Sequence, residues 1–374
     1  MDNKNVFIAI ALSMSVLLFW GAFVETPKPI DQKSKQNQNQ VENNLNVNNN
    51  ITPNINEPTE VKTITREESI NKFERVKIEN KNIIGSISLK GGIIDDISFK
   101  NYKQNLNNNK NIEFLNPKET KNGYFVETGW TSIGNGIKVP TINSIWTVKG
   151  NKILSENKPI ILEWNNGEGI VFKKIIEIDD KYFFKISQEV NNETASSIDL
   201  YPYAQITRNK IPDDIQNFYI SHEGFIGVFD EELKEDDYDD IEENKIVREA
   251  NNGWFGITDK YWMTALVPEK GKNFKSTFLY KNAFKANYIL NNPITIKASS
   301  SNSNKLKLFI AAKEVETIDT YAANLKIDKL DLVIDWGWFY FFTKPLFFVI
   351  DYLFKFSGNF GLAIILITIG IRLL

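Results

Sequence analysis

The stretch from Leu330 to Leu374 constrains the chain most, because it is strongly apolar and aromatic and carries charges at only a few positions. Its second part runs from Phe360 to Ile371 without a charge and then places Arg372 inside the apolar segment. If a membrane helix starts near Gly358, Arg372 lies about 21 Å along it, within a hydrocarbon core about 30 Å thick. The pattern therefore predicts a transmembrane helix over residues 358–374.

Arg372 has two interpretations. A guanidinium at the centre of a membrane helix costs about 2.5–3.5 kcal/mol, so such residues usually face a bundle interior or a wet cavity. The alternative is snorkelling, in which the long side chain reaches the interface. Position alone leaves both open. Helical spacing favours a polar or small stripe, because Thr368 and Gly361 lie four and eleven residues before Arg372.

The first part of the stretch, residues 330–357, predicts a helix lying in the membrane interface. Pro345 disfavours helix at the residue before it and is well placed to begin a new one. The segment Pro345–Phe356 would be about 18 Å long, too short to cross a bilayer, and Asp351 and Lys355 form an i,i+4 pair in the favourable order. Three aromatic residues suit the interfacial belt just before it: Trp336, Trp338 and Tyr340.

This end of the chain resembles the YidC-type membrane protein insertases through two segments, LDLVIDWGWFYFFTKPLF and GNFGLAIILITIGIR. In that family an amphipathic helix lies on the outer membrane face, and the next helix carries one arginine in a hydrophilic groove. By motif, Arg372 matches that arginine and Thr368 a groove-lining threonine, so the resemblance implies a substrate groove with Gly361 on the same stripe. The family's insertase core has several further membrane helices, which this sequence lacks.

The N-terminal residues 1–24 predict a membrane anchor, because Val6–Val24 is an unbroken uncharged run that nearly matches the hydrocarbon core in length. A cleaved signal peptide is the alternative. It would usually have a shorter apolar region and a small-x-small cleavage site, which the residues before Glu25 do not show. Residues 25–66 are rich in Asn and Pro and predict a disordered linker, since they cannot bury enough apolar surface to fold.

Most of the sequence from Glu67 to Ser303 predicts β-strands, because short apolar-polar runs are separated by Gly, Pro, Asn and Asp. The runs are Val76–Ile78, Ile87–Leu89, Ile142–Val148, Ile160–Trp164, Ile170–Ile178, Tyr182–Val190, Ser197–Ile206, Phe225–Phe229, Tyr261–Val267 and Phe274–Tyr280. Many short strands favour a large antiparallel β-sandwich. The period becomes helical over Lys313–Leu325, which predicts a short helix that completes a domain of residues 67–329.

This region is similar, more loosely, to the insertase family's large outer domain at three points: LKGGIIDDISFKNY from Leu89, FKKIIEIDDKYFFKISQEVNN from Phe172 and NNGWFGITDKYWMTALVP from Asn251. The resemblance implies a mainly β domain, a large sandwich of the sugar-binding kind, between α-helical transmembrane segments. It implies no catalytic activity.

Composition excludes several classes of site. The net charge of −3, without a basic patch, argues against nucleic-acid binding, and the absence of cysteine excludes disulfides and thiolate chemistry. A metal site of several histidines is impossible with His222 as the one histidine, which we expect to be structural. The acidic run Asp230–Glu243 lacks the spacing of a calcium loop, so we expect a solvated loop there. No cofactor is expected.

The resemblance implies a non-enzymatic membrane protein insertase and chaperone of the bacterial inner membrane. It would be multi-pass, with its large domain in the periplasm and with nascent membrane proteins, the lipid bilayer and the Sec translocon as partners. The alternatives are a membrane-tethered envelope module that binds sugars or acts as a mutarotase, and a structural scaffold of the envelope. His222 as the one available histidine weighs against a sugar-epimerising enzyme.

Overall fold

The computed structural model describes residues 63–373 except 106–108, 135, 214, 216–220 and 338. The described residues all belong to one compact unit, Ile55–Leu374. The predicted anchor over residues 1–24 lies outside them, as does the predicted linker up to residue 62. The last residue of that linker, Arg66, begins helix α2 (Arg66–Ile70), which Thr65 and Glu68 cap through reciprocal hydrogen bonds.

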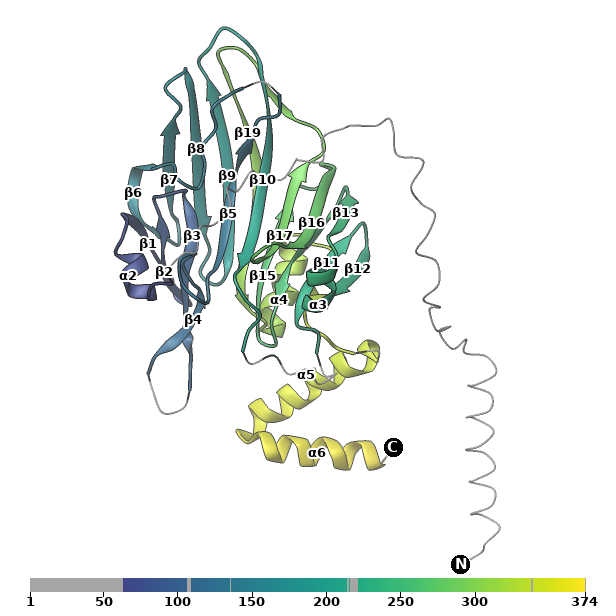
Figure 1. Cartoon of the computed structure of the whole chain (residues 1–374). Helices are drawn as coiled ribbons and strands as arrows, with labels where there is room; N and C mark the ends of the chain where they lie inside the picture. The colour runs from purple at the N-terminus through teal and green to yellow at the C-terminus, as the bar shows by residue number, and fades with distance from the viewer. Residues whose placement is uncertain are drawn as a thin grey trace, which may run out of the picture. The chain divides into compact units, whose positions relative to one another are not determined.

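Two large antiparallel sheets make up the domain (Figure 1). The first sheet has the order β13 (Ile246–Ala250), β16 (Phe274–Tyr280), β17 (Phe284–Leu290), β10 (Ile198–Arg208), β5 (Tyr124–Thr131), β3 (Ile93–Lys103), β2 (Ile83–Ser88), β1 (Arg75–Glu79), with β4 (Asn111–Leu115) also on β3. The second has the order β12 (Glu232–Asp236), β11 (Gly224–Phe229), β14 (Gly253–Thr258), β15 (Trp262–Pro268), β19 (Ser300–Ala312), β9 (Phe183–Asn192), β8 (Ile170–Ile178), β7 (Lys158–Asn165), β6 (Thr147–Ser155). The short β18 (Ile294–Ile296) pairs with β10.

Strand β6 belongs to both sheets. Its first half, Thr147–Gly150, pairs with β7, whereas Ile153 and Leu154 pair in parallel with Lys77 and Ile78 of β1. The pairing register with β7 shifts after Gly150, whose φ of 80° glycine adopts at no steric cost. One side of the sandwich is therefore closed by a strand that passes from one sheet to the other.

Strand β19, which comes last along the chain, lies at the centre of the second sheet. Strand β19 pairs with β9 along Ser300–Phe309 and with β15 along Leu306–Ala312. Strands β11, β12, β14 and β15 lie on one side of it, and β6 to β9 lie on the other.

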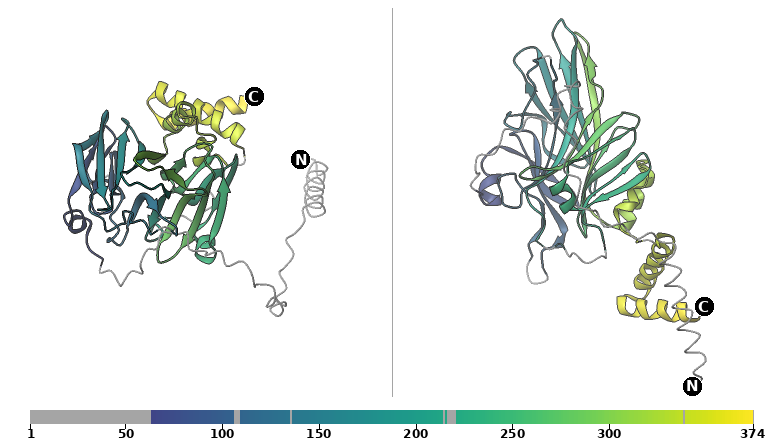
Figure 2. Two further views of the ribbon diagram at one scale, coloured as in Figure 1. Left: turned by 90° about the horizontal axis from the view of Figure 1, so that it is seen from above. Right: turned by 45° about the vertical axis from the view of Figure 1, so that its right-hand side comes forward.

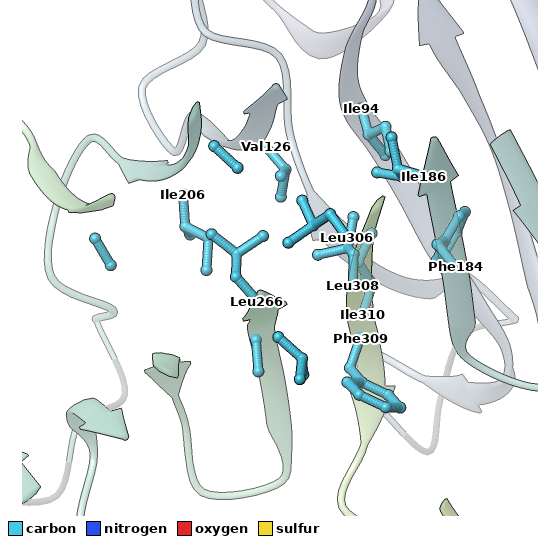
Figure 3. Packing of buried hydrophobic residues seen from close by; sticks show 14 of the residues in the cluster. Ile94, Val126, Phe184, Ile186, Ile206, Leu266, Leu306, Leu308, Phe309 and Ile310 are labelled. Carbon is cyan, nitrogen blue, oxygen red and sulfur yellow. The ribbon is translucent and has the colours of Figure 1, made fainter. Parts of the chain in front are cut away.

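The core lies between the sheets and is made by alternating inward-facing side chains. Every second residue of β9 is buried, including Phe184 and Ile186, and the corresponding residues of β19 are Leu306 and Leu308. Figure 3 shows these side chains packed with residues of the first sheet such as Ile206. Each such side chain contributes about 1.5–3 kcal/mol through burial. The predicted mainly β sandwich is confirmed.

Some strands were not predicted, and one was placed too early. In the run Ile142–Val148 the strand begins only at Thr147. The strands β3, β5, β14 and β17 were missed because most of their residues are buried on both faces, so the alternation that marks a half-exposed strand is weak. Burial on both sides hides a strand from a period-two search.

The acidic run Asp230–Glu243 is not the loop that was expected. It contains strand β12, paired with β11, and helix α3 (Tyr238–Glu243). Tyr238 and Ile241 are buried, so α3 packs on the domain through two apolar residues and leaves its carboxylates on the outside.

The predicted helix at the end of the domain is confirmed as α4 (Val315–Asn324), which follows β19 and buries Ile318. A short 3₁₀ helix, η1 (Leu330–Val333), comes next. Two further helices end the described chain, α5 (Tyr340–Ser357) and α6 (Phe360–Leu373), drawn in yellow in Figure 2.

Candidate functional site

The predicted interfacial helix exists as α5, but it begins at Tyr340 rather than at Pro345. Pro345 lies in the second turn, where it removes one backbone hydrogen bond, the one that a residue there would donate to Phe341. The residue before proline usually avoids helical backbone, yet Lys344 lies within α5. The prediction of where the helix starts was therefore wrong by five residues.

Helix α5 carries a high density of exposed aromatic side chains. Phe341, Tyr352 and Phe356 are 74%, 69% and 80% exposed, and none of the residues of α5 is classed as buried. Three charged residues, Lys344, Asp351 and Lys355, interrupt the apolar surface. The predicted i,i+4 pair is confirmed, because Lys355 Nζ lies 2.7 Å from an Asp351 carboxylate oxygen.

Helix α5 has 18 residues and α6 has 14. Within the described residues, no helix is both long enough and apolar enough to cross a membrane. At about 1.5 Å per residue, α6 is about 21 Å long.

A tight turn connects α5 to α6. Gly358 ends α5 in the left-handed conformation with φ of 65°, and its N–H donates to the Phe354 carbonyl oxygen at 2.8 Å. The Asn359 side chain then accepts from the Leu362 N–H at 3.1 Å and caps the start of α6. The rings of Phe354 and Phe360 meet edge to face across the turn, with centroids 6.0 Å apart. The two helices are thus coupled through specific side chains.

The three residues predicted to line a groove are all on α6. Arg372 is in its last turn, Thr368 lies one turn earlier, and the eleven-residue spacing puts Gly361 on the same stripe. The Thr368 hydroxyl donates to the Ile364 carbonyl oxygen at 2.7 Å, so its donor is used within the helix. Arg372 is exposed, and among the described residues no carboxylate lies within ion-pair distance of it.

The predicted interfacial aromatics differ in their surroundings. Trp338 lies outside the described residues. Trp336 is half-buried, with its ring edge to face against Phe347 at 5.6 Å and the Lys344 ammonium 5.8 Å from its centroid. The Tyr340 hydroxyl donates to Asp331 at 2.9 Å, so this residue is tied to η1.

Sequence reasoning missed a cluster of ion pairs that connects α5 to the domain. We call it the α4–α5 ion-pair cluster: Lys344 Nζ lies 2.9 Å from an oxygen of Asp319 on α4 and 2.9 Å from an oxygen of Asp331 in η1. Burial alone would lower the pKa of Lys344, but hydrogen bonds to both carboxylates raise it above its ordinary value. Burial opposes ionisation of Asp331 too, yet Lys344 and Tyr340 hold its pKa below the usual range. Lys344 and Asp331 are therefore both charged at neutral pH.

A second contact between the same helices lies further along. Lys355 Nζ, besides its bond to Asp351, is 2.8 Å from an oxygen of Glu316 on α4. Both partners are well exposed, so solvent screens this pair more than the Lys344 cluster. Only the pair within α5 could be found from spacing, because Asp319 and Glu316 are 25 and 39 residues from their lysines.

Helix α4 is in turn fixed to the sandwich by a buried polar network. Glu314, just before α4, accepts hydrogen bonds of 2.8 Å from the hydroxyls of both Tyr102 and Tyr182. Tyr321 of α4 donates to Asp179 at 2.6 Å. Burial, and then the hydrogen bond to Glu314, raises the pKa of Tyr102 to about 12, so its hydroxyl remains a donor at neutral pH. Contacts therefore run without interruption from the sheets through α4 to α5.

The His222 ring is in contact with polar groups on both of its nitrogens. Its Nε2 lies 2.9 Å from the Phe225 carbonyl oxygen, and its Nδ1 lies 3.4 Å from Asp237. Its backbone N–H donates to Asp335, in the segment that leads into α5.

Comparison with known proteins identifies these elements. A profile of the YidC periplasmic domain matches residues 75–349. The chain is 44% identical over 373 residues to the "Membrane protein insertase YidC" of Pelagibacter ubique strain HTCC1062, covering 100% of this chain and 66% of that protein. It is 36% identical over 402 residues to the protein of the same name from Brucella melitensis biotype 1 strain 16M, with coverage of 100% and 66%.

Among solved structures, a galactose mutarotase related enzyme from Lactobacillus acidophilus is similar, with a TM-score of 0.43 and 11% identity. The similarity covers 63% of this chain and 97% of that enzyme. The chain spans 66% of the length of the two curated relatives above. On the evidence of the matched domain and of these relatives, the chain belongs to the YidC family, and residues 75–349 match that family's periplasmic domain.

Proposed function

We propose that this protein serves as part of a membrane protein insertase and chaperone of the bacterial inner membrane. The observation that carries the proposal is the exposed aromatic surface of α5, which is attached to a folded periplasmic domain through the α4–α5 ion-pair cluster. Exposed apolar surface of this extent marks a site that contacts lipid or another protein. The names of the relatives support insertion as its purpose.

In this proposal α5 lies in the outer interface of the bilayer. Its aromatic side chains enter the headgroup region, while Lys344 and Lys355 remain on the side of the periplasmic domain, paired with acidic residues of α4 and η1. The sharp turn at Gly358 then directs α6 into the membrane, as the start of a second spanning segment after the anchor of residues 1–24. The protein is thus multi-pass, with its large domain in the periplasm.

The proposed mechanism makes no covalent bond. A hydrophilic groove, with Arg372, Thr368 and Gly361 on one stripe of α6, lowers the cost of moving a polar segment partway across the bilayer. Water and the guanidinium replace part of the hydration that the segment loses, and the positive charge favours acidic or polar tails. The apolar helix of the substrate then leaves sideways into lipid. Nascent membrane proteins are the substrates, and the Sec translocon is the proposed partner.

The experiment tests Arg372 in the full-length protein. Arg372→Lys keeps the charge but loses the fork of donors, and Arg372→Ala removes both. Cells depleted of their own insertase would express each variant at matched membrane abundance, and protease protection would measure translocation of a substrate with an acidic tail. We expect Lys to support most of the translocation and Ala to reduce it severalfold.

Leu366→Ala is the matched control, because it truncates an exposed side chain of α6 on a different face. The control should translocate normally. Equal translocation by Arg372→Ala and the unaltered protein, across several substrates, would remove the groove role from Arg372 and leave it as an interfacial anchor.

A further inference from the structure

The periplasmic domain has an open cleft of about 330 Å³ that is separate from α5 and α6. It lies where β4 and the end of β10 approach the turn between β14 and β15, and its lining includes Asn116, Asn122, Arg208, Glu223, Tyr261 and Trp262. The volume is at the lower end of the range of about 300–1,000 Å³ for small-molecule sites. The cleft therefore has room for a ligand of about one or two sugar rings.

The floor of the cleft is a rigid ion pair. Arg208 Nη1 lies 2.5 Å from an Asp259 oxygen and donates to the Tyr238 hydroxyl at 3.2 Å. The guanidinium lies over the Tyr124 ring, 4.6 Å from its centroid. The side chains of Arg208 and Asp259 are only 13% and 12% exposed. Since each charge is neutralised by the other, the floor offers fixed polar groups without a net charge.

One wall is aromatic and partly open to solvent. Tyr261 is 61% exposed, and its neighbour Trp262 is held from behind by the stacked ring of Phe99, with centroids 4.9 Å apart. Tyr102 contacts the same indole edge to face, also at 4.9 Å. Trp262 is thus fixed in place while Tyr261 presents an exposed ring.

The charges around the cleft nearly cancel. Its lining contains three cationic side chains and four acidic ones, and Lys210 is already paired with Asp213 at 2.6 Å. An anionic ligand would need an excess of cations, which this lining does not provide. Amides, carboxylates and lysines together supply both donors and acceptors. This combination suits a neutral ligand with many hydroxyl groups.

A hexopyranose has this chemistry, because its ring hydroxyls both donate and accept and its C–H face packs on an aromatic ring. We propose that the cleft is a binding site for a neutral hexopyranose, with Tyr261 and Trp262 as the stacking wall and Asn116, Asn122 and Arg208 as polar contacts. The site is independent of the insertion of membrane proteins by α5 and α6.

The position of the cleft admits two sources for the sugar. The Lys313 N–H donates to the Tyr261 carbonyl oxygen at 2.9 Å, and Lys313 lies two residues before α4, so the cleft is at the end of the domain from which the chain continues toward α5. The hexopyranose is therefore either a free sugar or the sugar headgroup of a glycolipid.

The experiment uses the full chain in phosphatidylcholine nanodiscs, with maltose as the probe and saturation-transfer NMR of the maltose C–H protons as the readout. Tyr261→Ala removes the exposed ring, and we expect it to weaken maltose binding about tenfold, as the loss of one stacking surface would. Tyr261→Phe keeps the ring and should retain most of the binding. Tyr280→Ala, which removes another exposed tyrosine from outside the cleft, is the matched control and should bind normally.

A second set of nanodiscs containing digalactosyl diacylglycerol distinguishes the two sources. Competition that reduces the maltose signal supports a glycolipid headgroup, whereas an unchanged maltose signal supports a free sugar. Absence of a maltose signal in the unaltered protein would overturn the proposal. Equal signals from Tyr261→Ala and Tyr280→Ala would also overturn it, because binding would then not involve the cleft.

Discussion

The β-sandwich and the helices α5 and α6 use the same types of residue in opposite ways. In the sandwich, Phe172 and Phe255 have no exposed surface, whereas Phe341 and Phe356 of α5 are 74% and 80% exposed. Aromatic burial stabilises the sandwich within its own chain. On α5, Phe347 and Phe354 contact Trp336 and Phe360, but Phe341 and Phe356 leave most of their surface exposed. The difference indicates that stability of the domain and function of the helices depend on different phenylalanines.

The sharpest way to test this contrast is a pair of truncations. Phe172→Ala should lower the free energy of unfolding of the domain by about 3–5 kcal/mol, because it leaves a cavity in the core beside Trp164. Phe356→Ala should change it by less than about 0.5 kcal/mol, since its ring is exposed. Urea unfolding of the full chain, followed by pulse proteolysis, measures both.

A measurement of membrane association should rank Phe172→Ala and Phe356→Ala in the opposite order. We expect Phe356→Ala to weaken insertion of α5 into lipid, seen as greater water exposure of a fluorescent label on the helix, while Phe172→Ala leaves label exposure unchanged at temperatures where the domain is folded. A large loss of domain stability in Phe356→Ala would contradict the division between the two regions.

The comparison extends to two cationic side chains, Lys174 in the sandwich and Arg372 on α6. Lys174 of β8 is 2% exposed, and its ammonium donates to the Gly91 and Gly92 carbonyl oxygens at 3.2 Å and lies 4.8 Å from the Trp146 centroid. Burial lowers the pKa of Lys174 to about 7. The sandwich thus accommodates its cation with its own groups, whereas Arg372 remains exposed on α6.

The lowered pKa of Lys174 predicts that the free energy of unfolding of the domain depends on pH. The unfolded chain holds the Lys174 proton up to a pH of about 10.4, but the folded chain releases it near 7, so the unfolded state binds more protons in between. Stability should therefore rise from pH 7 toward pH 10, on the order of 1 kcal/mol per pH unit, and fall as the pH drops through the folded pKa. Lys174→Met should remove this rise. Urea unfolding at several pH values measures it.

Lys185→Met serves as the control for the pH series, because Lys185 lies on the neighbouring strand β9 and is 44% exposed beside Glu177. Lys185→Met should leave the rise in stability between pH 7 and pH 10 unchanged. A slope that survives in Lys174→Met would assign the pH dependence to other groups.

The smallest effect concerns the contact between the two regions. Lys344→Gln removes the charge that bridges Asp319 and Asp331, and we expect a local loss of about 1–2 kcal/mol. Amide hydrogen exchange in η1 and the C-terminal half of α4 should then become roughly 5–30 times faster, while exchange in the sheets stays unchanged. Lys355→Gln, at the more exposed pair, should have little effect. Equal exchange in Lys344→Gln and the unaltered chain would show that the cluster does not hold α5 to the domain.

The sequence predicted those parts of the fold whose pattern is local. Strands β8 and β9 alternate between buried and partly buried positions, and Ile318 of α4 follows a helical period, so these elements were found. Strands such as β5 are buried on both faces and have no such signal. The start of α5 was misplaced because the prediction relied on proline disfavouring helix at the residue before it, whereas Lys344 and Pro345 both lie inside the helix.

In the candidate site, too, some features follow from local spacing and others depend on residues that are far apart in the sequence. The stripe of Gly361, Thr368 and Arg372 follows from helical spacing alone, and its groove role remains a prediction. The network around Glu314 depends on Tyr102 and Tyr182, more than 130 residues away, and the cleft depends on five separate segments of the chain. Such sites become visible only after the sheets have been assembled.

The central position of β19 has a consequence for the order of folding during synthesis. In the second sheet, strands β6 to β9 on one side and strands β11, β12, β14 and β15 on the other meet through β19, which ends at Ala312. Before β19 pairs, β9 and β15 each have an unpaired edge, and closing the β9 edge requires contacts such as Ser301 with Asn191, which are 110 residues apart. Helices α4 and α5 follow β19 directly in the chain. Because β19 comes late in the chain, we expect the second sheet to be completed only shortly before the segment that we propose to contact the membrane is synthesised.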